Sequence, residues 1–192
     1  MSERAAIPAM GDHDINAENL QRLYRVTTPL LRAMDHALGP RQVSIGIVAD
    51  SAINAANGGG GKFFVTTGLL AHSDDQLLRA VMAHEVAHED LGHVASLKLS
   101  GSGTNMILLE ELAAGRTAII PFAGPLNPVN YSPSEESAAD RQSIAIVERA
   151  GFDRKVMLDA LSWAAKNSPR SAAFHPGQQR LDQRIKRLRS LP

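Results

Sequence analysis

Two histidines and a glutamate in His84-Glu85-Val86-Ala87-His88 have the types and the spacing of a metal-dependent hydrolytic site. Residues four apart share one face of a helix, with about 5–6 Å between their Cβ atoms, so both imidazoles can reach one zinc ion. Glu85 is turned by about a hundred degrees from His84, because a helix has about 3.6 residues per turn. Its carboxylate would therefore lie beside the ion. Zinc acidifies water and polarises a carbonyl, and a neighbouring carboxylate can act as general base and then acid.

Local signals predict the helix that this HExxH pattern requires. Ser73 and Gln76 form a capping box that opens a helix running to about Lys98. At helical spacing both histidines fall within an apolar stripe, which consists of Leu77, Val81, His84, His88, Leu91 and Ala95. Buried imidazoles need partners for their polar nitrogens. A shared metal ion is one solution, and two hydrogen-bonded core histidines are the alternative.

The third metal ligand has to come from another segment. A catalytic zinc site usually takes three protein ligands and leaves the fourth position open. The metzincin pattern would place glycine at position 91 and histidine at 94, where this chain has Leu91 and Val94. His93 projects away from the stripe, and we interpret it either as a helix-end residue behind the site or as a surface histidine.

A second helix is predicted downstream of the HExxH segment. Ser132 and Glu135 form another capping box, and Pro133 occupies the first helical position, where its missing N–H does no harm. The helix should run to about Ala150, with Gly151 just past its end.

Glu136 and Asp140 lie one turn apart on a face of this helix that is otherwise inward-packing. Acidic side chains on such a face need a cation or a proton. We therefore predict Glu136 as the third metal ligand. Asp140 is expected to orient one of the ligand histidines through its other ring nitrogen. The alternative is a solvated acidic helix face.

These segments together resemble the gluzincin metallopeptidases that include HtpX-type membrane heat-shock proteases, CAAX prenyl proteases and small bacterial envelope proteases. The resemblance extends from about Asn19 to the C-terminus. It rests on Ile53–Ala55 with Gly60, Gly61 and Phe64–Leu70, on the HExxH segment with His93 behind it, on Glu136–Asp140, and on Phe174–Pro176. It implies an α+β, mainly helical zincin-type domain with a small β-sheet. It also implies one zinc ion per chain held by His84, His88 and Glu136, with Glu85 as the catalytic residue.

Three positions depart from the family pattern. Gly59 stands where proline commonly precedes the paired glycines, and Ser143 replaces a frequent glycine. The arginine expected six residues beyond His175 is Leu181 in this chain, with Arg180 and Arg184 nearby. The identity of a substrate-orienting arginine is therefore open.

A second donor should stabilise the oxyanion that develops during hydrolysis. His175 and Tyr131 are the candidates, and the sequence does not choose between them. His175 could instead fill the fourth zinc position and hold the enzyme in a latent state, or it could be a surface loop histidine.

The remaining residues are predicted to frame the site. Residues 1–16 should form a mobile leader, and 17–192 a single metallopeptidase domain with a sizeable core. Its expected elements are a helix from about Ala17 to Leu38 kinked at Pro29, a strand from Gln42 to Ala49 paired across the glycine turn with Lys62–Thr66, a helix from Asp153 to about Asn167, and a basic helix from Gln178 to Leu191. The exposed strand could bind an extended peptide at the sheet edge, or it could only support the metal helix.

Charge and composition restrict the partners. The net charge is zero and the pI is about 7.1, so nothing indicates nucleic acid. A C-terminal basic cluster is interpreted as a solvated helix face in preference to a phospholipid-binding patch; it comprises Arg180, Arg184, Lys186, Arg187 and Arg189. There is no cysteine, which excludes disulfides and thiolate ligands.

Neither a signal peptide nor a transmembrane span is predicted. The most apolar region, Met106 to Leu126, is interrupted by Glu110, Glu111 and Arg116. The resemblance favours the bacterial cell envelope or periplasm, whereas a complete chain without a leader would be cytoplasmic. The oligomeric state is left open.

Three functions compete. The first is a zinc endopeptidase acting on unfolded or misassembled polypeptides in protein quality control. The second is a non-catalytic chaperone or binding module stabilised by the metal, although a purely structural site would not need Glu85. The third is a zinc hydrolase of non-protein amides.

Overall fold

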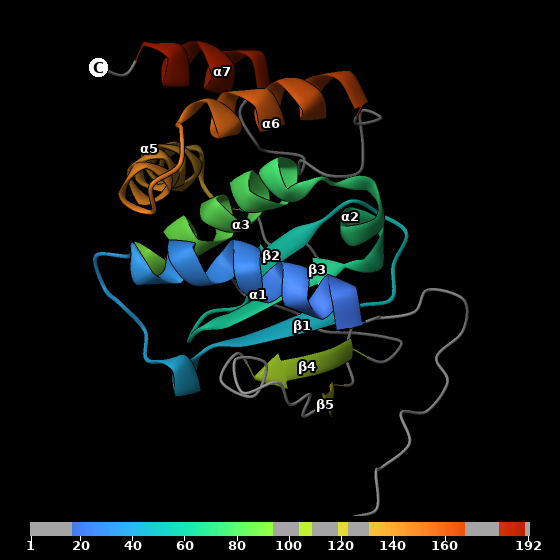
Figure 1. Ribbon diagram of the computed structural model, residues 1–192. Helices are drawn as coiled ribbons and strands as arrows, with labels where there is room; N and C mark the ends of the chain where they lie inside the picture. The colour runs from blue at the N-terminus through green and yellow to red at the C-terminus, as the bar shows by residue number, and fades with distance from the viewer. Residues whose placement is uncertain (1–16, 94–103, 109–118, 123–130, 168–180, 191–192) are drawn as a thin grey trace, which may run out of the picture.

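The computed structural model describes residues 17–93, 104–108, 119–122, 131–167 and 181–190. Helices are stacked on one side of a mixed five-stranded sheet (Figure 1). The sheet has the order β2-β3-β1-β4-β5, with β1 at Ser44–Val48, β2 at Ala55–Asn57, β3 at Lys62–Thr66, β4 at Thr104–Leu108 and β5 at Ile119–Phe122. The predicted α+β, mainly helical fold is confirmed.

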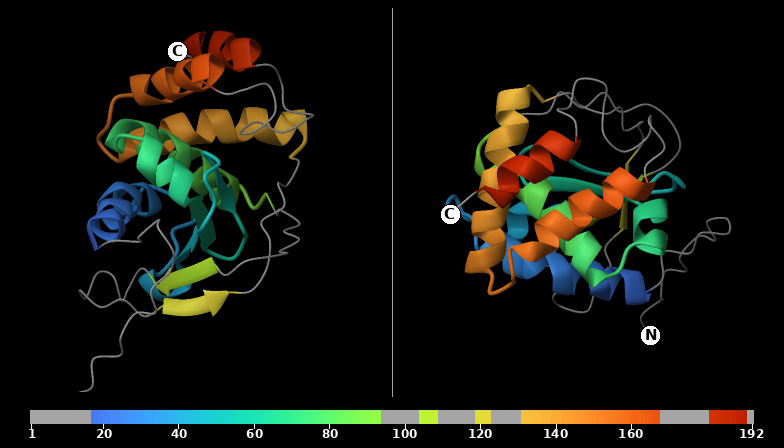
Figure 2. Two further views of the ribbon diagram at one scale, coloured as in Figure 1. Left: turned by 90° about the vertical axis from the view of Figure 1, so that its right-hand side faces the viewer. Right: turned by 90° about the horizontal axis from the view of Figure 1, so that it is seen from above.

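Six α-helices are described, together with a short 3-10 turn at Pro40–Gln42. They are α1 (Ala17–Arg32), α2 (Thr67–His72), α3 (Asp75–Asp90), α5 (Pro133–Arg149), α6 (Lys155–Asn167) and α7 (Leu181–Arg189). Helix α3 has α1 and β2 on one side and α5 and α6 on the other, and α7 packs on α5 and α6 (Figure 2). The helix that carries the HExxH segment is thus the centre of the molecule.

The strand pairing differs from the prediction. β3 does pair with β1, but in parallel, with Ser44 opposite Lys62. The glycine turn joins β3 to β2 instead, in an antiparallel pair. Parallel strands cannot be joined by a tight turn, and here β2 supplies the required intervening chain. Because β1 and β3 both have neighbours on either side, the edge strands of the described sheet are β2 and β5.

The apolar region from Met106 to Leu126 contributes strands that the sequence analysis did not predict. β4 pairs antiparallel with β1, and β5 pairs antiparallel with β4. No helix in the described part of the chain combines the length and apolar character needed to cross a bilayer.

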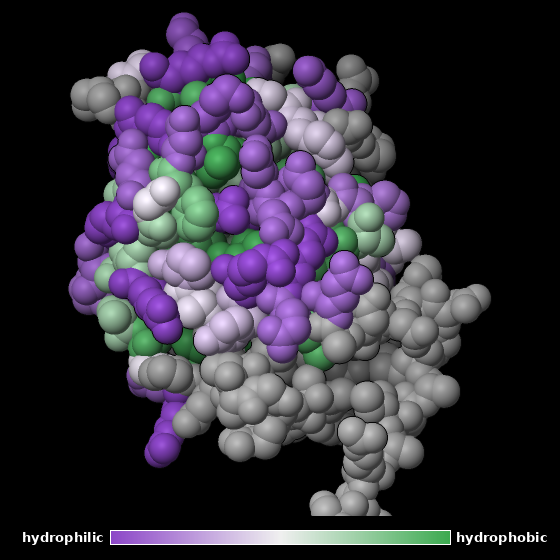
Figure 3. Space-filling model, viewed as in Figure 1, coloured by the Kyte–Doolittle hydropathy of each residue, from purple (hydrophilic) through white to green (hydrophobic). Residues whose placement is uncertain are grey.

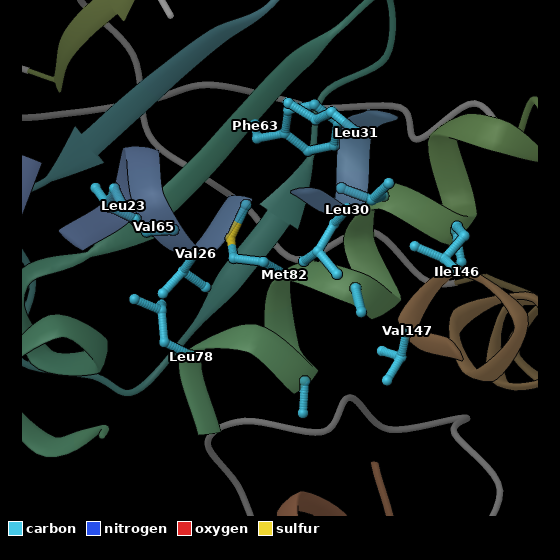
Figure 4. Close-up of a cluster of buried hydrophobic side chains, with 14 of the residues drawn as sticks. Leu23, Val26, Leu30, Leu31, Phe63, Val65, Leu78, Met82, Ile146 and Val147 are labelled. Carbon is cyan, nitrogen blue, oxygen red and sulfur yellow. The ribbon is translucent and has the colours of Figure 1, made fainter. Parts of the chain in front are cut away.

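The main hydrophobic core lies between α1, the sheet and α3, and continues to α5 (Figure 4). Helix α1 supplies Leu23, Val26 and Leu30, all at most 1% exposed. Figure 4 shows these side chains meeting Phe63 and Val65 of β3, Leu78 and Met82 of α3, and Ile146 and Val147 of α5. Hydrophilic side chains cover most of the described part of the face in Figure 3.

Helix α3 begins and ends at other residues than predicted. Its N-cap is Asp74, whose side chain accepts from the backbone N–H of Leu77 at 2.7 Å, and not Ser73. The helix ends at Asp90, well before Lys98. Gly92 follows with a φ of 66° and forms a glycine-terminated helix end, which satisfies the last carbonyls.

Helix α5 follows its predicted signals closely, and α6 ends at the predicted Asn167. Ser132 caps α5 by accepting from the N–H of Glu135, and the Glu135 carboxylate accepts from the Ser132 N–H at 2.7 Å. Helix α1 contains Pro29 and ends at Arg32, somewhat earlier than Leu38. The suggested leader at 1–16 and the segment around His175 lie outside the described residues. The single-domain boundary therefore stays a prediction.

Candidate metal centre

The structure brings His84, His88 and Glu136 together at the contact between α3 and α5. One potential ligand atom from each lies within 4.8 Å of the others. The Nε2 atoms of His84 and His88 are 3.2 Å apart, and their rings meet edge to face. Glu136 Oε2 lies 3.3 Å from His84 Nε2, and Glu136 Oε1 lies 4.0 Å from His88 Nε2.

These separations fit a divalent cation. Ligand bonds of about 2.0–2.1 Å in a tetrahedral site correspond to about 3.3–3.4 Å between ligand atoms. Two of the three separations in the cluster are within about 0.2 Å of that spacing. Two imidazoles and one carboxylate are also a donor set of catalytic zinc sites. A possible metal site is therefore present, and the residues fit the ion.

Glu136 and Asp140 are buried, so the alternative of a solvated acidic helix face is wrong. Each is 2% exposed, and both lie on the face of α5 that packs inward. Asp140 Oδ1 is 3.5 Å from His84 Nδ1, the ring nitrogen that points away from the cluster. The predicted pairing of Asp140 with a candidate ligand histidine is consistent with this placement.

Arg184 of α7 corrects a second expectation. The sequence analysis assigned it to a solvated basic face, yet it is 3% exposed. Its Nε and Nη2 donate to the two oxygens of Asp140 at 2.9 Å and 2.6 Å. Its Nη1 lies 3.6 Å from Glu136 Oε2. The spacing of Leu181, Arg184 and Leu188 would have indicated the inward face, since residues three and four apart share one side of a helix.

His93 supports the cluster from behind. Its Nδ1 lies 3.0 Å from Nδ1 of His88, and its side chain is half-buried. This contact favours the interpretation of His93 as a residue behind the site. The chain reverses at Gly92, and the N–H of His93 bonds back to the carbonyl of His88 at 2.9 Å. A continuous helix would have carried His93 away from the site.

The stripe predicted for α3 is not its most buried face. Leu77, Val81 and His84 are half-buried, and Leu91 is 39% exposed. Leu78, Met82 and Val86 of α3 are fully buried in the main core. His84 and His88 face the junction with α5, and of these two only His88 is fully buried.

Glu85 is held by the edge strand. Its Oε2 accepts from the backbone N–H of Asn57 in β2 at 2.8 Å. One turn further along α3, Glu89 Oε1 accepts from the N–H of Gly61 at 2.8 Å. The carboxylates of Glu85 and Glu89 thus join α3 to the hairpin formed by β2, the glycine turn and β3. The role of the Asn57 backbone was not predicted, because no local pattern reveals a contact between a backbone amide and a distant side chain.

Burial dominates the electrostatics of the cluster. Desolvation raises the pKa of Glu85 to about 7, although the nearby His84 opposes the shift. Desolvation lowers the pKa of His88, and the positive charges of His84, His93 and Arg184 lower it further. For His84, burial is outweighed by the hydrogen bond to Glu136 and the charge of Asp140, so its pKa is raised. The lowered pKa favours the neutral imidazole of His88, which is the form that metal ligation requires.

Tyr131 lies against the His88 ring. The two rings stack with centroids 3.6 Å apart and planes inclined by 15°. Burial raises the pKa of Tyr131, with a further contribution from the Glu85 carboxylate, so its phenol stays protonated. The structure thus brings Tyr131 to the cluster, while His175 lies outside the described residues.

The fold and the cluster of His84, His88 and Glu136 define a metallopeptidase domain of the zincin type. The profile of Peptidase family M48 matches residues 17–191, and the chain belongs to this family of metalloproteases. The narrower likeness to HtpX-type and CAAX prenyl proteases stays a prediction.

Curated relatives give a similar indication. The chain is 29% identical over 167 residues to a putative beta-barrel assembly-enhancing protease of Vibrio cholerae, which covers 76% of this chain and 34% of the relative. It is 27% identical over 156 residues to the beta-barrel assembly-enhancing protease of Escherichia coli K12, and this match covers 69% of the chain and 32% of the relative. The protein of that name from Yersinia pestis is 26% identical over 164 residues. The chain spans about a third of the length of these relatives.

Proposed function

We propose that this chain is a zinc-dependent endopeptidase whose ion is held by His84, His88 and Glu136. The observation that carries the proposal is the convergence of their ligand atoms at α3 and α5. Glu85 lies on α3 between the two histidines and interacts electrostatically with His84 and Glu136. A bound zinc ion would supply Lewis acidity toward water and toward the scissile carbonyl.

The residues of the chain have separate roles in this proposal. Glu85 removes the proton from the attacking water and returns it to the leaving amine. The Asn57 N–H fixes one of its carboxylate oxygens. Asp140 and His93 orient the two ligand imidazoles from their outer sides. The oxyanion is stabilised by Tyr131 or by His175, and His175 could instead occupy the fourth ligand position in a latent enzyme.

The proposed substrates are unfolded or misassembled polypeptides. The relatives are named for enhancing β-barrel assembly, and we propose a corresponding quality-control role in the bacterial cell envelope. The edge strand β2 favours an extended substrate, because an edge presents unpaired backbone groups for strand addition. No nucleic acid is expected among the partners.

The test compares the wild type with Glu85→Gln and with Glu89→Gln as the matched control. Glu89 lies one turn away on α3 and also accepts from a backbone N–H, but it belongs to no proposed catalytic group. Each purified protein is loaded with one equivalent of zinc, checked by anomalous scattering or elemental analysis, and assayed on casein. Glu85→Gln should keep the ion and lose about 10²- to 10⁴-fold in rate. Glu89→Gln should retain activity.

The same assay separates the competing functions. Stoichiometric zinc without casein cleavage in any variant would favour a metal-stabilised binding module. Hydrolysis of small amides without cleavage of casein would favour a non-protein amidase. A wild type that binds no zinc, or binds it equally well after Glu136→Ala, would overturn the proposed ligand set.

A further inference from the structure

The charged side chain of Arg184 extends from helix α7 to the candidate metal ligands. Arg184 is buried and makes two hydrogen bonds to Asp140, at 2.9 Å and 2.6 Å. Its third guanidinium nitrogen, Nη1, lies 3.6 Å from Glu136 Oε2. The same side chain therefore contacts both the candidate ligand and the carboxylate behind His84.

Two buried acids on one helix face need such a partner. Glu136 and Asp140 are one turn apart, where like charges on a helix repel each other. Burial removes the water that would otherwise screen them. An arginine is suited to this position, because its guanidinium stays charged and its planar fork matches a carboxylate with two parallel bonds. A lysine could supply the charge but not the fork.

We propose that Arg184 is a positioning residue of the metal centre. It fixes the Asp140 carboxylate so that Oδ1 stays 3.5 Å from His84 Nδ1, and it keeps Glu136 aimed at the two histidines. Without Arg184, the two carboxylates repel each other and one of them turns away. This change removes support from a ligand. The inference rests on the ion-binding part of the proposed function.

Arg187 provides a matched comparison within the same helix. It lies one turn from Arg184 and also bonds to α5, where its Nη1 donates to the Ser137 hydroxyl at 2.6 Å. Ser137 and Arg187 are half-buried, and neither contacts the ligand atoms in any described interaction. Loss of Arg187 therefore weakens the docking of α7 without removing the charge from the cluster.

The experiment measures zinc affinity by chelator competition and the visible absorption spectrum of the cobalt-substituted protein. Arg184→Met should bind zinc about 10- to 100-fold more weakly, the usual cost of removing a residue that supports a ligand. Its cobalt spectrum should change, because the ligand geometry changes. Arg184→Lys should recover part of the affinity. Arg187→Met should stay within about twofold of the wild type and keep its cobalt spectrum, since it touches no group that supports a ligand.

A double variant keeps the test decisive if Arg184→Met folds poorly. Arg184→Met combined with Asp140→Asn removes the buried ion pair as a unit, which proteins often tolerate. Because Arg184 acts largely through Asp140, Arg184→Met should weaken zinc binding less in the Asp140→Asn background than in the wild type. Equal losses in both backgrounds would overturn the inference, as would unchanged affinity and cobalt spectrum in Arg184→Met. Wild-type protein that binds no zinc would instead refute the proposed function itself.

Discussion

Gly61 is the position in the hairpin where a methyl group should do most damage. Its φ is 76°, and a Cβ built on it would lie 2.2 Å from the backbone oxygen of Gln42. Its N–H donates to Glu89 at 2.8 Å, and its carbonyl accepts from the N–H of Ser44 at 2.9 Å. Alanine at this position therefore cannot be accommodated without moving β3 away from β1 or from α3.

The cost of Gly61→Ala follows from these contacts. The left-handed conformation costs alanine about 1–2 kcal/mol. The displaced backbone weakens one neutral hydrogen bond, worth about 0.5–1.5 kcal/mol, and one to a carboxylate, worth about 1.5–3 kcal/mol. We expect a total loss of about 3–6.5 kcal/mol in the free energy of unfolding, a large part of the roughly 5–15 kcal/mol typical of a domain.

Gly59→Ala is the matched control for this prediction. Gly59 has a nearly identical φ of 75°, but a Cβ there meets no atom within 4 Å. Gly59→Ala should therefore lower the free energy of unfolding only by the cost of the left-handed conformation, about 1–2 kcal/mol. Urea unfolding followed by circular dichroism measures both variants. Equal losses in the two would refute the argument that close approach to Gln42 decides the effect.

Three further predictions concern stability. Gly92→Ala should cost about 1–2 kcal/mol in thermal unfolding, because Gly92 has a φ of 66° at the end of α3 and open space around it; no loss would show that the helix end tolerates a side chain. Ser132→Ala should cost about 1 kcal/mol in urea unfolding by removing the cap of α5, with Ser132→Asp, which keeps an accepting oxygen at the N-cap, as the control. Hydrogen bonds from Arg25 and Arg22 lower the pKa of Asp75 below its usual 3.8, so its stabilising contribution is present above that pH and is lost as the pH falls through the lowered value. Because this carboxylate is 41% exposed, the wild type should exceed Asp75→Asn by only about 0.2–1 kcal/mol near neutral pH, and the difference should vanish in acid.

Local signals were sufficient for α5, the helix that carries Glu136 and Asp140. The capping box at Ser132, Pro133 after it and Gly151 at the far end define α5 almost to the residue, because caps and breakers act over one turn. The helical spacing of Glu136 and Asp140 likewise predicted that they share one face of α5. The end of α3 was missed although Gly92 was a visible stop signal, because the apolar periodicity was followed past it.

Contacts between distant segments were beyond local reasoning. Local spacing would have placed Arg184 on the inward face of α7, but its partners Asp140 and Glu136 depend on where α7 packs. The parallel pairing of β1 with β3 likewise depends on where β2 is placed in the sheet. Strand pairs far apart in the chain carry no sequence signal comparable to a helix cap, so their partners could not be assigned.

Each member of the candidate metal site is held from its outer side by another residue. Asp140 lies behind His84, His93 lies behind His88, and Arg184 lies beside Glu136. The main core is formed largely by other residues, the apolar side chains of α1, the sheet, α3 and α5. The fold thus does not depend on the ion in the way that a zinc finger does.

Chelation should therefore leave the protein folded but less stable. Metal removed with EDTA should leave the far-ultraviolet circular dichroism spectrum unchanged, while the melting temperature falls. The loss follows from linkage: an ion present at about a thousandfold its dissociation constant stabilises the native state by about 4 kcal/mol. Added zinc should restore the melting temperature, and Glu136→Ala should abolish that response. Cooperative loss of helix on chelation would show that the ion builds the site, and that the contacts behind His84, His88 and Glu136 do not preform it.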